Sequence, residues 1–134
     1  MRRQLFLMCL LLSLLTLAVY WQVGDHKFIN LDDTQYITKN QHVQQGLASE
    51  SITWAFSITD ISYWHPLTWL SLMLDYELYG TNPRGYHLTN VALHILNVLF
   101  LFLILKWLTG SLWRSAFVAA LFALHPLNVE SVAW

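Results

Sequence analysis

The amino-acid sequence predicts an all-α membrane protein with about three transmembrane helices, and its composition is the first reason. Hydrophobic residues make up 56% of the 134 residues and charged residues only 11%, against roughly 25% charged residues in typical soluble proteins. Seven tryptophans and six tyrosines fit membrane–water interfaces, where amphipathic rings are favoured. Nucleic acid is not an expected partner, because the net charge is −1 and nucleic-acid binding needs a basic surface.

The first predicted membrane helix is the near-continuous apolar run 5–23. At 1.5 Å per residue it is about 28 Å long, close to the thickness of the bilayer core. Arg2 and Arg3 before it would also suit a cleaved signal peptide. The run ends without a small-residue cleavage pattern, so we expect an uncleaved anchor.

Residues 24–86 form a long loop that is rich in apolar and aromatic residues, which argues against disorder. Asn40 and Gly46 frame a short helix as its N-cap and C′ residues, and 51–56 is a second candidate. A third helix is predicted over 66–79, with proline in its first turn and Gly80 after its end. It carries an apolar stripe, which fits a helix on the membrane surface and equally a helix packed in a lumenal domain; the stripe comprises Leu67, Leu70, Met73, Leu74 and Leu78.

The second predicted membrane helix covers 87–108, and the third covers 114–126. The apolar part of the third run is too short to span a bilayer unless its ends are extended, so a short re-entrant helix is the alternative. The positive-inside rule assigns the orientation. Two basic residues, Arg2 and Arg3, precede the first apolar run. Two more, Lys106 and Arg114, lie at the link between the second and third runs. This places the N-terminus in the cytoplasm and both the loop 24–86 and the tail 125–134 on the extracytoplasmic side.

An acidic pair, Asp32 and Asp33, follows the first membrane helix by about ten residues. One carboxylate can bind a divalent cation or a cationic group while the other accepts a proton. Adjacent residues of an extended strand point to opposite faces, so one acid can be structural. On the residues alone, an Asx turn or a helix cap is the competing interpretation.

Polar residues recur along the second membrane helix at spacings of three, four and three, namely His87, Asn90, His94 and Asn97. This polar stripe lies on one helix face, within roughly 80°. It predicts either a wet cavity or hydrogen bonds between helices. The two histidines are about 10 Å apart along the helix axis, which disfavours a shared metal ion.

Four further residues on the expected outer side are candidate ligands of a phosphate, a sugar or a lipid headgroup. His65 and His125 each begin a His-Pro-Leu sequence at an expected helix boundary, where a plain helix-ending turn is the alternative. Glu130 follows near the end of the third helix that is expected on the extracytoplasmic side. Arg84 is the only arginine on that side, which suits an anionic headgroup.

At these motifs the chain resembles the transmembrane and tetratricopeptide-repeat O-mannosyltransferase family. The resemblance is carried by four stretches in order, residues 28–40, 64–71, 82–90 and the start of 125–134. Bacterial membrane proteins with tetratricopeptide repeats share these motifs, and the motif sequences of this chain resemble theirs more closely. The resemblance therefore favours a bacterial inner membrane over the endoplasmic reticulum.

The family resemblance implies a membrane glycosyltransferase of the multi-spanning C-type fold, here as its N-terminal fragment. Such an enzyme moves a sugar, here mannose, from a polyprenyl-phosphate carrier to an acceptor hydroxyl, on a protein, at the extracytoplasmic side. The catalytic acid of the first outer loop maps onto Asp32 or Asp33. Arg84, a histidine or a divalent cation (Mg²⁺ or Mn²⁺) would ease the charge of the leaving phosphate. We expect three membrane segments alone to be inactive.

Two other function classes stay open on the sequence. One is a non-catalytic membrane module or remnant, in which the polar stripe only joins helices. The other is a fragment of a transporter or flippase that uses the same stripe as a polar path. Transporters often contain internal repeats, and only the two His-Pro-Leu sequences recur here.

Overall fold

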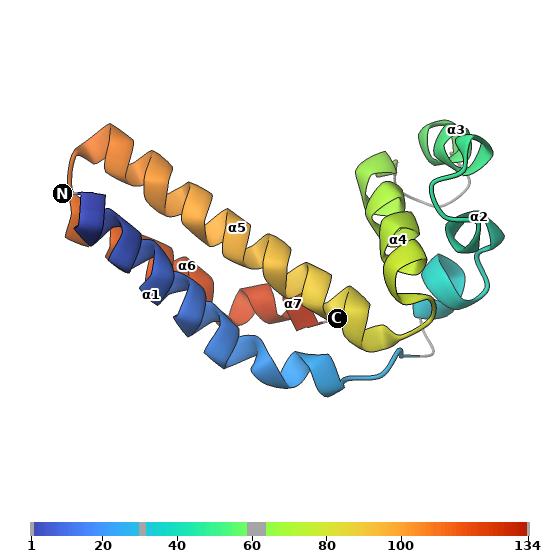
Figure 1. Cartoon of the computed structure of the whole chain (residues 1–134), viewed down its shortest axis with the longest axis horizontal. Helices are drawn as coiled ribbons and strands as arrows, with labels where there is room; N and C mark the ends of the chain where they lie inside the picture. The colour runs from blue at the N-terminus through green and yellow to red at the C-terminus, as the bar shows by residue number, and fades with distance from the viewer. Residues whose placement is uncertain (1, 30–31, 59–63, 134) are drawn as a thin grey trace. The chain divides into compact units, whose positions relative to one another are not determined.

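The computed structural model describes residues 2–29, 32–58 and 64–133. Every regular element in these ranges is helical, which confirms the predicted fold class (Figure 1). Motif residues Asn30, Leu31 and Trp134 lie outside the described part. The elements in order are α1 (Arg2–Tyr20), η1 (Trp21–Asp25), η2 (Thr34–Thr38), α2 (Gln41–Gln44), α3 (Ser49–Ser57), α4 (Pro66–Tyr79), α5 (Pro83–Thr109), α6 (Leu112–Leu124), η3 (Pro126–Asn128) and α7 (Val129–Ala133).

The chain divides into two compact units. The membrane unit comprises Met1–His26 and His87–Trp134, and the loop unit comprises Lys27–Tyr86. The boundary falls close to the predicted loop 24–86. It separates the apolar helices from the segment that holds most of the acidic residues.

Among the described residues, two helices are long and apolar enough to cross a membrane. They are Arg2–Asp25 with 24 residues, which joins α1 to η1, and α5 with 27 residues. At 1.5 Å per residue they are about 36 and 40 Å long, more than the roughly 30 Å of the hydrocarbon core. They contain the predicted helices 5–23 and 87–108. They run a few residues further because backbone hydrogen bonding continues into flanks whose side chains are no longer apolar.

The third segment is a broken helix. α6 has 13 residues, and the chain then bends by 51° into η3 and α7, a pair that could form one broken span or a re-entrant loop. Pro126 begins η3; it has no backbone N–H to donate to the preceding turn, so the helix stops before it. The prediction of 114–126 thus lies two residues late at both ends, and both alternatives for this segment remain compatible with the bend.

The core of the membrane unit joins large side chains of α1 and α5 to small side chains of α6. Small residues on one helix allow close helix–helix approach. At the other end of these helices the rings of His26 and His87 meet with centroids 6.0 Å apart, so α1 and α5 run antiparallel, as Figure 1 also shows. The buried core consists of Met8, Leu12, Val98, Phe102, Ala116, Ala119 and Ala123.

The loop unit is built from short helices whose ends are set by local chemistry. The Asn40 side chain caps α2 by accepting hydrogen bonds from the backbone N–H groups of His42 and Val43. Gly46 follows in the left-handed region with φ +67°, as its predicted C′ position requires. A Cβ at Gly46 would also collide with the Glu77 side chain, whose carboxylate accepts from Leu47 N at 2.8 Å.

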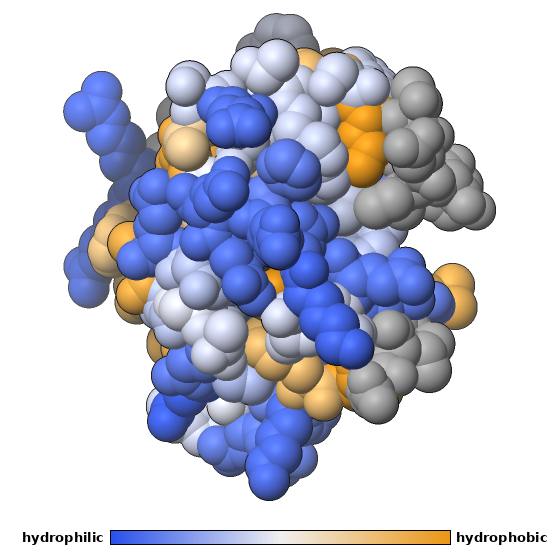
Figure 2. Space-filling view, turned by 90° about the vertical axis from the view of Figure 1, so that its right-hand side faces the viewer, coloured by the Kyte–Doolittle hydropathy of each residue, from blue (hydrophilic) through white to orange (hydrophobic). Residues whose placement is uncertain are grey.

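The residues of the apolar stripe predicted on α4 do not all lie in the same surroundings. Met73 is fully buried with Trp69, Val43 and Ala55 in the core of the loop unit, whereas most of the stripe's leucines are exposed. The unit's core therefore takes a different face of α4 from the one that the leucines mark. Figure 2 looks from the side of Figure 1 where α2 and α3 lie, and it shows a mostly hydrophilic face with apolar side chains between.

Candidate functional site

The residues predicted to form the site fall into both units. Asp32, Asp33, His65 and Arg84 belong to the loop unit. His87, His94, His125 and Glu130 belong to the membrane unit. Each group therefore has its own geometry, which decides what its members are able to do.

The two acids of the pair have different surroundings. Asp33 is half-buried, and its Oδ2 accepts a hydrogen bond from Ile29 N at 2.6 Å. Asp32 is exposed, and its backbone carbonyl accepts from Gln35 N and Tyr36 N, each at 2.9 Å. Asp33 precedes η2 but makes no side-chain cap to it. The helix-cap interpretation therefore does not describe Asp33. Its carboxylate is oriented instead by the hydrogen bond from the backbone N–H of Ile29, four residues earlier in the chain.

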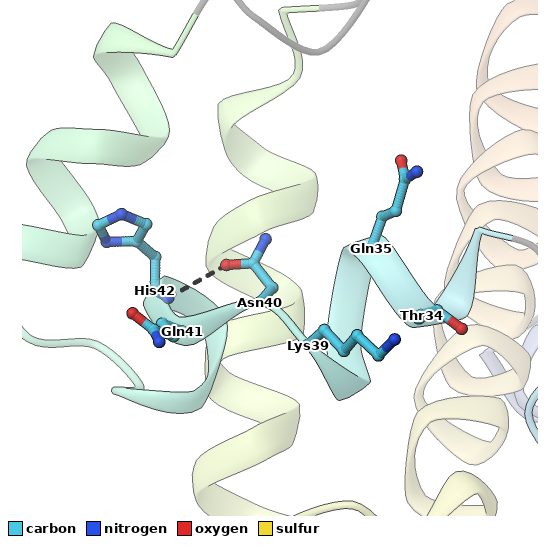
Figure 3. A pocket seen from close by; sticks show the side chains of 6 residues that line it. All are labelled: Thr34, Gln35, Lys39, Asn40, Gln41 and His42. Atoms are coloured by element: carbon cyan, nitrogen blue, oxygen red, sulfur yellow. Dashed lines mark hydrogen bonds between the residues drawn. The ribbon is translucent and has the colours of Figure 1, made fainter.

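A polar hollow of about 480 Å³ lies directly after the acidic pair in the chain. Figure 3 shows that its lining comes from two consecutive short helices, η2 and α2, and from the two residues between them, Lys39 and Asn40, of which Asn40 caps α2. The lining offers amide, hydroxyl and ammonium groups, so it suits a polar ligand and an anionic one near the ammonium. The lining residues are Thr34, Gln35, Lys39, Asn40, Gln41 and His42.

Next to α2, five rings form what we call the ring cluster: Tyr36, His42, Trp54, His65 and Trp69. His65 stacks on Tyr36 with centroids 5.7 Å apart and on Trp69 at 5.1 Å. His42 stacks on Trp54 at 4.5 Å. Within the described part of the chain, His42 Nδ1, His65 Nε2 and Trp69 Nε1 are buried without a hydrogen-bond partner. Buried polar atoms are normally paired, so these nitrogens make the cluster a candidate contact for a polar ligand.

Arg84 lies exposed in the first turn of α5. Its backbone N donates to Asn82 Oδ1 at 3.2 Å, which caps the start of the helix. Nearby, the Tyr86 hydroxyl donates to Gly80 O at 2.9 Å, and its ring packs edge-on against Phe28. The guanidinium is thus held on a well-anchored backbone, as a ligand for a headgroup or phosphate would need.

The polar stripe of α5 does not lie on one uniform surface. His87 and His94 are buried, Asn90 is half-buried and Asn97 is exposed. His94 Nε2 is 3.2 Å from the carbonyl oxygen of Ala123 in α6. At His94 the geometry therefore corresponds to the helix-joining interpretation.

The next two candidate residues, His125 and Glu130, follow α6 at a helix boundary. His125 is exposed, and its Nδ1 accepts a hydrogen bond from Leu127 N at 3.2 Å, which caps η3. Glu130 is exposed in the first turn of α7, where a negative charge is favoured by the helix dipole. His125 thus occupies the turn between the end of α6 and the start of η3.

The described residues contain no group of three or more histidine, cysteine, aspartate or glutamate side chains able to hold a metal ion. Mg²⁺ is commonly bound through only one or two carboxylates together with substrate phosphates. The exposed carboxylate of Asp32 fits that mode of binding, and Asp33 has one oxygen that Ile29 N already occupies.

Sequence reasoning missed the ring cluster apart from His65. Its members come from four places along the chain, and only the fold brings them together. The one local signal is the density of aromatic residues and histidines in residues 36–69. That density indicates a packed domain without identifying which rings meet.

The curated proteins to which the chain is similar include several protein O-mannosyl-transferases. The chain is 31% identical over 133 residues, 93% of its length, to protein O-mannosyl-transferase Tmtc2 of Drosophila melanogaster. It is 43% identical over 70 residues to Tmtc1 of the same organism and 39% identical over 71 residues to TMTC3 of Mus musculus, in each case over 52% of the chain. No family model and no solved structure matches.

These matches cover only a small part of each relative. The chain spans 14% of the length of Tmtc2, 8% of Tmtc1 and 7% of TMTC3. Within that part the similarity to Tmtc2 runs through both units. The chain is therefore homologous to a segment of the Tmtc protein O-mannosyl-transferases.

Proposed function

We propose that this chain belongs to the O-mannosyltransferase family and forms part of a membrane enzyme that transfers mannose from a polyprenyl-phosphate carrier to a hydroxyl group of a protein. The observation that carries the proposal is the similarity to Tmtc2 over 93% of the chain. In the sequence, the loop unit lies between two helices that are apolar enough to span a membrane. That arrangement suits a reaction between a lipid-linked donor and a protein outside the bilayer.

In this mechanism a carboxylate of the acidic pair removes the proton from the acceptor hydroxyl. The oxygen attacks the anomeric carbon of mannose, the bond between that carbon and the carrier phosphate breaks, and the phosphate leaves with the electron pair. We assign the base to Asp33, because the bond from Ile29 N to its Oδ2 orients the carboxylate and leaves Oδ1 for the acceptor. A positioned base is more effective than one that must be ordered during the reaction.

The leaving phosphate needs positive charge or hydrogen-bond donors more than it needs an acid. We assign this role to Arg84, which is exposed in the first turn of α5. Asp32 can hold Mg²⁺ or Mn²⁺ jointly with the donor phosphate. His65, His87, His94, His125 and Glu130 remain proposed contacts of the sugar or phosphate, although the bonds that His94 and His125 make also have structural roles.

The test compares Asp33→Asn with Asp32→Asn in the full-length protein, using mannose transfer from a polyprenyl-phosphate donor in isolated membranes. The amide keeps the size of the side chain but cannot accept the proton. General-base catalysis contributes roughly 10²–10⁴-fold, so Asp33→Asn should lose at least 10²-fold in turnover. Asp32→Asn should lose less, and raising the concentration of the divalent cation should recover part of that loss.

Glu50→Gln is the matched control, since Glu50 is an exposed acid of the loop unit in the first turn of α3. It should keep the parent's turnover. If both aspartate variants insert correctly and transfer mannose at the parental rate, the acidic pair is not the base. Loss in Asp32→Asn alone would reverse the assignment within the pair.

A further inference from the structure

The polar hollow of the loop unit is open to solvent along much of its lining. Gln35, Lys39 and Gln41 are exposed, and their side chains make no hydrogen bond or ion pair with any other residue that the structure describes. The volume of about 480 Å³ falls within the roughly 300–1,000 Å³ of pockets that hold small ligands. The hollow therefore offers free polar groups to a ligand of that size, such as a few residues of another polypeptide.

The first helix of the lining, η2, is a π-helix, and its wide turn brings Lys39 next to Thr34. Lys39 N donates to Thr34 O at 2.9 Å, across five residues. Residues five apart in an α-helix point about 140° away from each other, whereas the i→i+5 bond places one nearly above the other. In Figure 3 the Lys39 side chain extends along η2 on the side of Thr34. The turn thus sets the ammonium group close to the start of η2.

The start of η2 is also where the acidic pair lies, because Asp33 directly precedes Thr34. Consecutive Cα atoms are about 3.8 Å apart, so Asp33 and Lys39 belong to one small part of the loop unit. An extended polypeptide rises about 3.3 Å per residue. A chain that presents a hydroxyl group to Asp33 would consequently reach Lys39 within about three residues.

The other groups of the hollow match a polypeptide backbone. A carboxamide offers an acceptor oxygen and N–H donors, as a peptide group does, and Gln35, Asn40 and Gln41 each contribute one. In Figure 3 the side chains of Gln35, Asn40 and His42 project in the same direction. His42 Nδ1 is buried without a hydrogen-bond partner among the described residues, and stacking on Trp54 at 4.5 Å holds its ring. A backbone group of a bound segment would supply the missing partner.

The charges around the hollow discriminate between polypeptides. Among the lining residues only Lys39 is charged, and the acidic pair precedes the first of them in the chain. A segment with an acidic side chain over Lys39 gains an ion pair, whereas a basic side chain there is repelled. An acidic side chain over the acidic pair is repelled in turn. The pattern therefore favours an acid on one side of the hydroxyl and not on the other.

We propose that the polar hollow binds the segment of the acceptor protein that carries the hydroxyl, and that Lys39 selects segments with an aspartate or glutamate about three residues from it. The carboxamides bind the backbone of this segment, and Lys39 pairs with its acidic side chain. The role of the segment as an acceptor rests on the proposed function, whereas its binding to the hollow is independent of the transfer reaction.

The test measures binding of fluorescent peptides to the purified full-length protein. Each peptide has one serine, with aspartate or lysine three residues before or after it. On one of these sides the parent should bind the aspartate peptide about fivefold more tightly than the lysine peptide, near the upper limit for an exposed ion pair. Lys39→Glu should reverse this preference, and Lys39→Met should abolish it. Lys27→Glu makes the same charge change at an exposed lysine outside the hollow and should keep the parent's preference.

Mannose transfer in isolated membranes gives a second readout. Lys39→Glu should raise KM for the preferred aspartate peptide at least fivefold while kcat stays unchanged. Gln35→Ala and Gln41→Ala should raise KM for aspartate and lysine peptides alike, with KM for the lipid-linked donor unchanged. A parent protein that binds the peptides with the expected preference but transfers no mannose would contradict the proposed function and not the peptide site.

Three outcomes would overturn the proposal. Equal binding of aspartate and lysine peptides by the parent, or an unchanged preference in Lys39→Glu, would exclude Lys39 as the selecting residue. A raised KM for the donor in place of the peptide in Gln35→Ala and Gln41→Ala would assign the hollow to the donor. Resistance of each variant to proteolysis, compared with the parent, checks that the loop unit is folded.

Discussion

His94 satisfies a backbone group that the end of a helix would otherwise leave without a partner. The last four carbonyls of an α-helix have no intrahelical donor, and Ala123 is next to the last residue of α6. His94 Nε2, 3.2 Å from that carbonyl oxygen, must carry the hydrogen, since a carbonyl only accepts. In the same turn, Asn128 Nδ2 donates to Phe122 O at 2.6 Å. Buried carbonyls in an apolar environment are costly unless they are bonded.

We predict that His94→Leu lowers the free energy of unfolding in detergent by about 1 kcal/mol and that His94→Gln restores part of the loss. Glutamine places an N–H donor at a similar distance from the backbone, whereas leucine has none. Asn97→Leu is the control, because Asn97 is exposed on the same helix and should not reduce stability. A His94→Leu protein as stable as the parent would exclude the helix-joining role.

At the scale of elements, helices with local start and stop signals could be predicted closely. The prediction for α4 matched both ends, since proline and glycine set them, and the Asn40 cap of α2 formed as expected. The predicted bounds of the third membrane segment lay two residues too late. The helix already begins with Leu112 and Trp113, before Arg114. The ring cluster could not be predicted, because its stacking depends on contacts between residues far apart in the chain.

The packing of α6 against α1 and α5 depends on the small size of its alanines. Ala119 is fully buried among Met8, Leu12 and Phe102, so a larger side chain has no room without moving a helix. We predict that Ala119→Leu destabilises the membrane unit by about 1–3 kcal/mol, measured by thermal unfolding in detergent. Val118→Leu, at an exposed position on the same helix, should be neutral. Equal stability of both variants would show that the helices are not closely packed there.

At the scale of the whole molecule, the antiparallel pairing of α1 and α5 gathers basic residues at one end of the membrane unit. Arg2 and Arg3 begin α1, and Lys106 lies in the last turn of α5. Arg114 follows immediately in α6. From the sequence, the positive-inside rule assigned these residues to the same side of the membrane. The fold brings them to one end, because the opposite ends of α1 and α5 meet at His26 and His87.

This distribution predicts that the end bearing the arginines faces the cytoplasm and the loop unit faces away from it. A reporter enzyme that works only outside the cytoplasm should be active when fused after Gly80 and silent when fused after Gly110. Both glycines have open space around the Cβ position, so an attached chain should not disturb the packing.

Neutralising the charges tests the cause of this orientation. Replacing Arg2, Arg3, Lys106 and Arg114 by glutamine removes the positive end while leaving helix length unchanged, so the ratio of the two reporter activities should fall toward one. Replacing Lys27 and Lys39 of the loop unit instead should leave the ratio high. A silent Gly80 fusion with an active Gly110 fusion would place the acidic pair in the cytoplasm, and a transfer reaction at the extracytoplasmic face could then not use Asp32 or Asp33.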